Sequence, residues 1–135
     1  MINTVELLYK QYKQLRDVVV EKWHEQLQIP LSNSEWSCLN AIVEGASSIP
    51  EIMVRNEITK QAAHKVIRNL EEKKLLTTCL IKSPKIRRQI TLTELGIETY
   101  QKSLQVQHEV EQQLQKSLGD EDYQNFIRVI NKKWL

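Results

Sequence analysis

Residues 47–93, SSIPEIMVRNEITKQAAHKVIRNLEEKKLLTTCLIKSPKIRRQITLT, contain the pattern that decides the fold. Apolar residues recur at helical spacing from Ile49 to Met53, which predicts a short helix. A turn at Asn56-Glu57 separates it from a second helix, expected over about 60–74. Two segments rich in β-forming residues then flank a basic turn at 82–87. The stretch therefore predicts helix, turn, helix, strand, turn and strand, which is the element order of a winged helix-turn-helix.

Charge is concentrated in the same stretch. Residues 55–88 contain ten Lys/Arg and three Glu, a net charge of +7, whereas the remaining nine basic and fourteen acidic residues give −5. The two values sum to the +2 of the whole chain. A positive field confined to one module is suited to phosphate contact, so we expect double-stranded DNA as the partner.

The second helix of the stretch presents two different faces. Its apolar face is expected to be buried, and Thr59 is expected to cap its first turn. The other face is polar and basic, and the residues expected to contact DNA are Thr59, Lys60, Gln61, Ala62, His64, Lys65 and Arg68. Gln61 and Lys65 have the chemistry to read base edges, and Thr59, Lys60 and Arg68 to hold phosphates. The competing interpretation of this face is an ordinary solvated helix surface.

The hairpin adds a second set of candidate DNA contacts. They are Lys82, Lys85, Arg87 and Arg88, in or beside the turn that would form the wing. For Arg88 an ion pair with an acidic residue of the protein is the alternative. Backbone or minor-groove contact is the expected role of this set.

The flanking segments predict long helices. Residues 4–27 carry an apolar stripe that includes Val5, Leu8 and Tyr12, and Ser32 or Ser34 should cap a helix over about 35–44. Thr93 should cap a helix reaching Leu118, with Gly96 tolerated in its first turn and a stripe of Leu104, Gln107, Val110, Glu111, Leu114 and Leu118. Asp120 should cap a last helix with an apolar face of Tyr123, Phe126, Ile127, Ile130 and Trp134.

These terminal stripes exceed what a winged helix-turn-helix can cover. We expect the whole chain, 1–135, to be a single domain that is mainly α with a small β-hairpin wing. Residues 31–92 would form the DNA-binding lobe, and 4–30 and 93–135 the dimerisation helices. A homodimer would shield the stripes and set two recognition helices about 34 Å apart, as a palindromic operator requires.

Composition places the chain in an ordinary class. It has 135 residues, 41% hydrophobic and 27% charged, with no apolar run near the length of a membrane span. The N-terminus lacks the pattern of a signal peptide, and the two cysteines form no disulfide framework, so a cytoplasmic location is expected. No catalytic constellation or phosphate loop is recognisable, so we expect no enzyme and no cofactor.

Four pieces of the chain carry a family resemblance: LSNSEWSCL at 31–39, IPEI at 49–52, ITKQAAHKVIRNLEEKKLL at 58–76 and LTELG at 92–96. In this order and spacing the chain resembles the MarR family of bacterial transcriptional regulators. The resemblance implies an obligate dimer, a recognition helix at about 59–73 and a wing in the minor groove. The wing departs from the family, which usually has Asp-x-Arg at its tip. Here the segment from Ser83 to Arg88 has no Asp and is about one residue shorter, and Arg87 most nearly takes the arginine's place.

Other residues admit sharper interpretations. Cys38 and Cys79 are expected to be structural thiols rather than redox sensors. A metal site using His24, Glu25, His108, Glu109 and Glu111 lacks a diagnostic spacing, so no metal is expected. The aromatic residues Trp23, Trp36, Trp134, Tyr9, Tyr12 and Tyr100 could line a pocket for a small-molecule effector, and core packing explains them equally well.

Two classes of function follow. The leading hypothesis is a dimeric, sequence-specific DNA-binding regulator, a repressor that an effector releases from its operator. The alternative is a protein-interaction adaptor or antirepressor that keeps the winged-helix fold without DNA binding, and the unusual wing is its support. Salt-dependent affinity for duplex DNA discriminates between the two.

Overall fold

The computed structural model describes residues 3–135. Its elements in chain order are α1 (Thr4–Gln26), α2 (Asn33–Val43), α3 (Ile49–Asn56), α4 (Lys60–Glu72), β1 (Leu76–Ile81), β2 (Arg87–Leu92), α5 (Glu94–Leu118) and α6 (Asp120–Ile130). The mainly α class, the hairpin and the order of elements are as the sequence predicts. None of the helices in this range is both long enough and apolar enough to span a bilayer.

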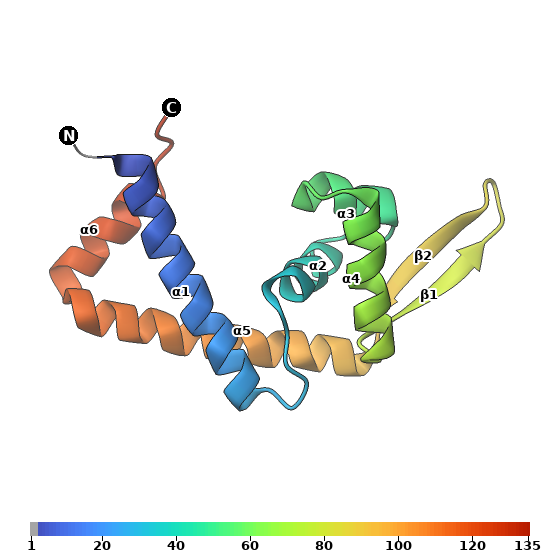
Figure 1. Ribbon diagram of the computed structural model, residues 1–135, viewed down its shortest axis with the longest axis horizontal. Helices are drawn as coiled ribbons and strands as arrows, with labels where there is room; N and C mark the ends of the chain where they lie inside the picture. The colour runs from blue at the N-terminus through green and yellow to red at the C-terminus, as the bar shows by residue number, and fades with distance from the viewer. Residues whose placement is uncertain (1–2) are drawn as a thin grey trace.

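The elements divide into a lobe and an arm joined by one helix (Figure 1). The lobe contains α2, α3, α4 and the hairpin, which projects away from the other elements. The arm contains α1, α6 and the distal part of α5, and the C-terminus lies there. Helix α5 runs beneath the lobe into the arm and packs against α1, α2 and β2 on the way. Helix α5 therefore connects the arm to the lobe and packs against elements of both.

Hydroxyl and amide side chains begin most of the helices. Ser32 and Glu35 form the expected capping box at α2, and Thr59 and Thr93 accept the expected hydrogen bonds at α4 and α5. The prediction that Asp120 caps α6 is wrong. Gly119 holds the cap position without a side-chain bond, and Asp120 is the first helical residue. Its carboxylate instead accepts a hydrogen bond from Gln115 Nε2 at 3.3 Å.

The core of the lobe is formed where the three short helices meet the base of the hairpin. Its fully buried large side chains include Leu31, Leu39, Ile52, Leu70, Leu75 and Leu76. The strands pair antiparallel from Leu76 opposite Leu92 to Ile81 opposite Arg87, and only the base of the hairpin reaches the core. Because the outer part lacks such contacts, the hairpin extends as a free wing.

Aromatic packing joins the arm to the lobe. Trp23 is fully buried and stacks on Trp36, which stacks on Tyr100, with ring centroids 6.0 and 6.1 Å apart. Trp23 Nε1 donates to the Ser103 carbonyl at 3.1 Å, and Trp36 Nε1 donates to Ser103 Oγ at 3.0 Å. These rings are therefore packed core, whereas Trp134 lies apart in the arm, half exposed.

The buried face of α5 differs from the predicted stripe. Thr99, Ser103, Val106 and Val110 are buried, whereas Leu104 and Leu118 are exposed. The physical reason is the tryptophan pair, which requires a hydrogen-bond acceptor at Ser103 and turns the next position outward.

Gly96 has a stricter role than the expected tolerance. It is buried, and a Cβ atom built on it would lie 2.0 Å from the backbone oxygen of Leu75. That oxygen accepts the amide of Thr93, so helix and strand are joined at this point. Only glycine permits this approach.

Candidate nucleic-acid interface

Helix α4 presents the predicted residues on its exposed side. Thr59, Lys60, Gln61, Ala62, His64, Lys65 and Arg68 are all exposed, whereas Ala63, Val66, Ile67 and Leu70 are buried. The apolar face of α4 thus packs into the core, and its polar face is exposed to solvent. The turn before it is tight, because Glu57 adopts the left-handed conformation at φ 52° and Ile58 is half-buried beside the core.

An ion pair fixes the far end of α4. Lys73 Nζ lies 2.8 Å from Glu35 Oε2 and also donates to the carbonyl oxygen of Pro30 at 2.9 Å. The Glu35 side chain is only 6% exposed. Burial by itself raises the pKa of Glu35, but the Lys73 ammonium and the Ser32 amide outweigh it, so the pKa lies below its usual value. The end of α4 is therefore tied to the first turn of α2 by an ion pair and to the α1–α2 connection by a hydrogen bond.

The wing residues divide into bound and free. Arg88 donates to Thr78 Oγ1 at 3.2 Å, and that hydroxyl donates to Glu71 of α4 at 2.8 Å. Arg88 therefore braces the wing against the helix through a hydroxyl, which is close to its predicted alternative of pairing with an acid. Lys82, Lys85 and Arg87 are exposed, and none of them forms an ion pair within residues 3–135.

The effective charge of the interface is smaller than the sequence count implies. Arg55 pairs with Glu44 at the end of α2, and Lys73 pairs with Glu35. In the described chain the basic side chains of this region without an ion pair, apart from the braced Arg88, are Lys60, Lys65, Arg68, Lys74, Lys82, Lys85 and Arg87. All seven are exposed on α4, just after it or on the wing.

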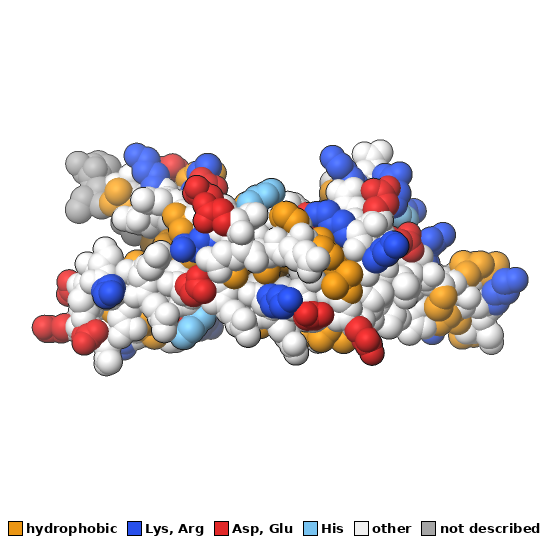
Figure 2. Space-filling model, turned by 90° about the horizontal axis from the view of Figure 1, so that it is seen from below, with side chains coloured by type: hydrophobic (Ala, Val, Ile, Leu, Met, Phe, Trp, Pro, Cys, Tyr) orange, Lys and Arg blue, Asp and Glu red, His pale blue; other side chains and the backbone are white. Residues whose placement is uncertain are grey.

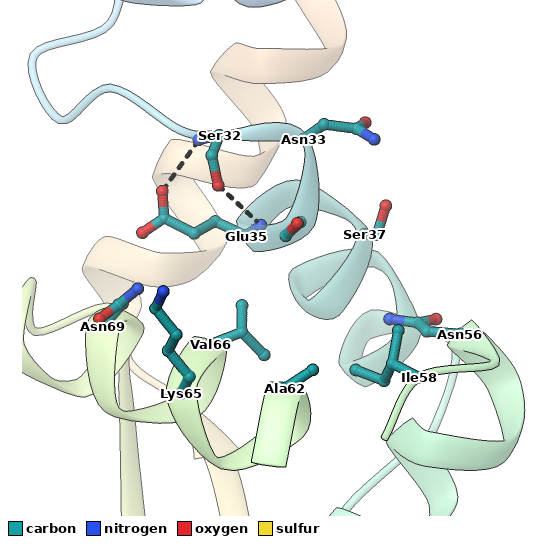
Figure 3. A pocket seen from close by; sticks show the side chains of 11 residues that line it. Ser32, Asn33, Glu35, Ser37, Asn56, Ile58, Ala62, Lys65, Val66 and Asn69 are labelled. Carbon is teal, nitrogen blue, oxygen red and sulfur yellow. Dashed lines mark hydrogen bonds between the residues drawn. The ribbon is translucent and has the colours of Figure 1, made fainter. Parts of the chain in front are cut away.

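A groove of about 500 Å³ adjoins the exposed face of α4. Lys65 and Asn69 rise from α4 toward the first turn of α2, where Ser32 and Glu35 exchange the capping hydrogen bonds (Figure 3). The remaining lining is mostly uncharged and polar, with Asn33, Ser34, Ser37 and Asn56 alongside Ile58, Ala62 and Val66. The interface thus continues from the helix onto the start of α2.

Sequence reasoning missed this groove. Its walls come from segments about thirty residues apart, and the sequence of residues 32–34 by itself indicates only a helix cap. One cap needs a single Ser or Asn, so the additional Ser and Asn residues are the signal that indicates a polar groove here.

Apart from His64, which lies on the exposed face of α4, the cysteines and histidines lie on other elements. Cys38 is buried in α2, and burial raises the pKa of its thiol to about 12, so it is inert packing. Cys79 is exposed in β1, which does not fit the expected packed thiol. His108 Nδ1 lies 3.6 Å from Glu111, and Glu109 accepts from Gln26 at 3.0 Å. Residues 3–135 bring no three His, Cys, Asp or Glu together as a metal-binding group.

Comparison with known proteins identifies the lobe. The sequence model of the MarR family matches residues 29–89, from the α1–α2 connection to β2. No curated protein matches the chain by sequence.

Solved structures extend the likeness to the arm. MarR of E. coli has a TM-score of 0.81 at 16% identity, with 96% of each chain covered. MepR of Staphylococcus aureus, a regulator of the multidrug efflux pump MepA, has a TM-score of 0.76 at 22% identity. The match covers 96% of this chain and 94% of MepR. The MarR-family protein Rv2887 of Mycobacterium tuberculosis, in its complex with DNA, has a TM-score of 0.74 at 21% identity, and 96% of each chain is covered. Rv2887 was also solved with p-aminosalicylic acid.

The profile match covers the lobe, and the structural neighbours share lobe, arm and the connection between them. The chain therefore has the winged-helix fold of these MarR-family structures, and its residues 29–89 match the sequence model of that family.

Proposed function

We propose that the protein is a sequence-specific DNA-binding transcription regulator that acts as a homodimer, most simply as a repressor. The observation that carries the proposal is the set of seven basic side chains without an ion pair, all on α4, just beyond it or on the wing. Cations that the protein leaves without an ion pair are available to phosphates. The proposal includes a cytoplasmic location.

Within this proposal the contacts divide by chemistry. Gln61 and Lys65 lie on the exposed face of α4 one helical turn apart, so both side chains can reach the same stretch of major groove. Thr59, Lys60 and Arg68 hold phosphates and set the register of the helix. Lys82, Lys85 and Arg87 contact the flanking backbone, and Arg88 acts by bracing the wing.

The first test is fluorescence-anisotropy titration with a random-sequence duplex at two salt concentrations. Release of counterions makes the slope of log affinity against log salt about −0.9 per phosphate contact, so a regulator loses affinity steeply as salt rises. A protein that ignores DNA at low salt would refute the proposal and favour a protein-binding adaptor.

Replacing Gln61 and Lys65 together by alanine is expected to lower affinity for a selected operator about a hundredfold per half-site, since each base contact contributes about 1–3 kcal/mol. Affinity for random duplex should fall much less, because only one cation per protomer is lost. Lys116→Ala, an exposed charge in the last turn of α5, is the matched control and should change neither. Equal losses on operator and random duplex would contradict base reading.

The arm supports the homodimer. Val5, Leu7, Tyr9 and Trp134 are each more than half exposed, and α6 has no buried residue at all. Apolar surface on this scale is expected to pair with a second copy. Light scattering should give a mass near twice 15.9 kDa at micromolar concentration. A mass of 15.9 kDa under these conditions would contradict the dimer.

An effector has a place to act at the junction of arm and lobe. A pocket of about 220 Å³ between α1 and α5 is lined by Tyr12, Arg16 and Gln107, and the Arg16 guanidinium lies 5.6 Å from the Tyr12 ring centroid. A ligand here would change the distance between the two recognition helices and so the affinity for the operator. Operator affinity measured with and without aromatic carboxylates tests this part of the proposal.

A further inference from the structure

The tip of the wing combines apolar and basic side chains. Residues 82–87 are all exposed, and Ile86 is 74% exposed between Lys85 and Arg87. Leu80, near the end of β1, is 56% exposed. No acidic residue occurs between Glu72 and Glu94. Figure 2 shows apolar and basic surface together at the end of the molecule where the hairpin projects.

Packing within the described chain does not account for Ile86. The face of the hairpin that contains Leu76, Thr78 and Ile90 is covered only at its base. Strands of six residues carry the turn about 20 Å from that base. Single exposed apolar side chains are common on proteins. The position of Ile86 is distinctive because it lies at the far end of the projecting hairpin, next in sequence to two cations.

The cations identify the partner. Neighbouring residues of a strand point to opposite faces, so Arg88, bound to Thr78, faces α4 while Arg87 faces away and has no ion pair within residues 3–135. Lys82, Lys85 and Arg87 thus give the turn that contains Ile86 a positive charge that no ion pair within residues 3–135 neutralises. A polyanion with a narrow groove and apolar sugar walls complements such a tip.

We propose that Ile86 enters the DNA minor groove as an apolar wedge, with Lys85 and Arg87 on the phosphates to either side. This rests on the proposed DNA-binding function. Apolar side chains in the minor groove partly unstack a base step and bend the duplex toward the major groove. The wing would then select flexible pyrimidine–purine steps on either side of the operator without hydrogen bonds to bases.

The experiment uses the full-length protein and a selected operator carrying 2-aminopurine at each flanking step in turn. Unstacking should raise 2-aminopurine fluorescence at one step in each half-site. Ile86→Ala should abolish that rise and weaken operator binding about tenfold, while the salt slope stays unchanged because no charge is lost. Arg87→Ala should instead reduce the magnitude of the salt slope by about one per wing.

Ile97→Ala is the matched control, since Ile97 is an isoleucine 46% exposed on α5, away from the wing. It should leave fluorescence and affinity as in the wild type. An Ile86→Ala variant with full fluorescence and affinity overturns the wedge and leaves the DNA-binding function intact, whereas wild type that binds no duplex overturns both. Binding to anionic phosphatidylserine vesicles, or self-association, that is lost with Ile86 while the DNA signals persist would also overturn it.

Discussion

Gly96→Ala is expected to destabilise the protein by about 3–4 kcal/mol, a large part of the stability of a single domain. The new methyl group would lie 2.0 Å from the backbone oxygen of Leu75, and relieving the clash requires helix α5 to separate from the start of the hairpin. In an exposed helix the same change would stabilise by up to about 1 kcal/mol, so the sign itself is diagnostic. Denaturation by urea, followed by circular dichroism at fixed protein concentration, measures the effect.

Gly119→Ala provides the comparison. Nothing lies within 4 Å of a Cβ built there, so only the backbone strain at φ 85° remains, expected to cost about 1–2 kcal/mol. If both variants lost the same stability, the close approach at Gly96 would not be the cause.

Lys73→Met is expected to have the second largest effect on stability, lowering the free energy of unfolding by about 2 kcal/mol at neutral pH. The substitution keeps the length of the side chain but leaves the Glu35 carboxylate, 6% exposed, without its cation. Breaking a buried pair from one side is costly, and the partial exposure of Lys73 puts the value at the low end. Because Lys73 also holds the end of α4, operator affinity should fall, whereas Lys73→Arg should retain most of it.

The pH dependence gives a separate test of the same pair. In the wild type the pKa of Glu35 lies below its ordinary 4.5, so its contribution is complete above pH 4.5 and is lost as pH falls through the folded-state value. Without Lys73, burial is opposed only by the hydrogen bonds to Ser32, so the pKa of Glu35 should lie higher than in the wild type and the ionised carboxylate should contribute less stability. The difference in free energy of unfolding between the wild type and Lys73→Met should therefore become smaller as pH falls. A difference that stays constant from pH 4 to 7 would contradict the ion-pair account.

Local signals predicted the elements of the lobe. Thr59 and Thr93 cap their helices, and the face of α4 marked by Val66 and Leu70 is buried, because capping and periodicity depend on residues within one or two turns. The same signals placed the candidate DNA contacts on the exposed side of α4. Such features require no knowledge of distant partners.

Contacts between distant residues could not be read in this way. Lys73 belongs to a charged run, residues 71–74, that looks solvated, yet its partner Glu35 lies 38 residues away. Ser103 is buried ahead of Leu104 because two tryptophans from other helices bind it. The left-handed residues Glu57 and Lys74 carry no glycine signal, since the surrounding packing imposes their conformation.

The length of α5 has a mechanical consequence. Its 25 residues form a continuous rod of about 37 Å, anchored beside the hairpin by Gly96 and ending in the arm. Such a rod works as a lever: when one end is held, a tilt of about 5° moves the other end by about 3 Å. A small change of angle at the arm can thus displace the end of α5 beside the hairpin by about the rise of one base pair.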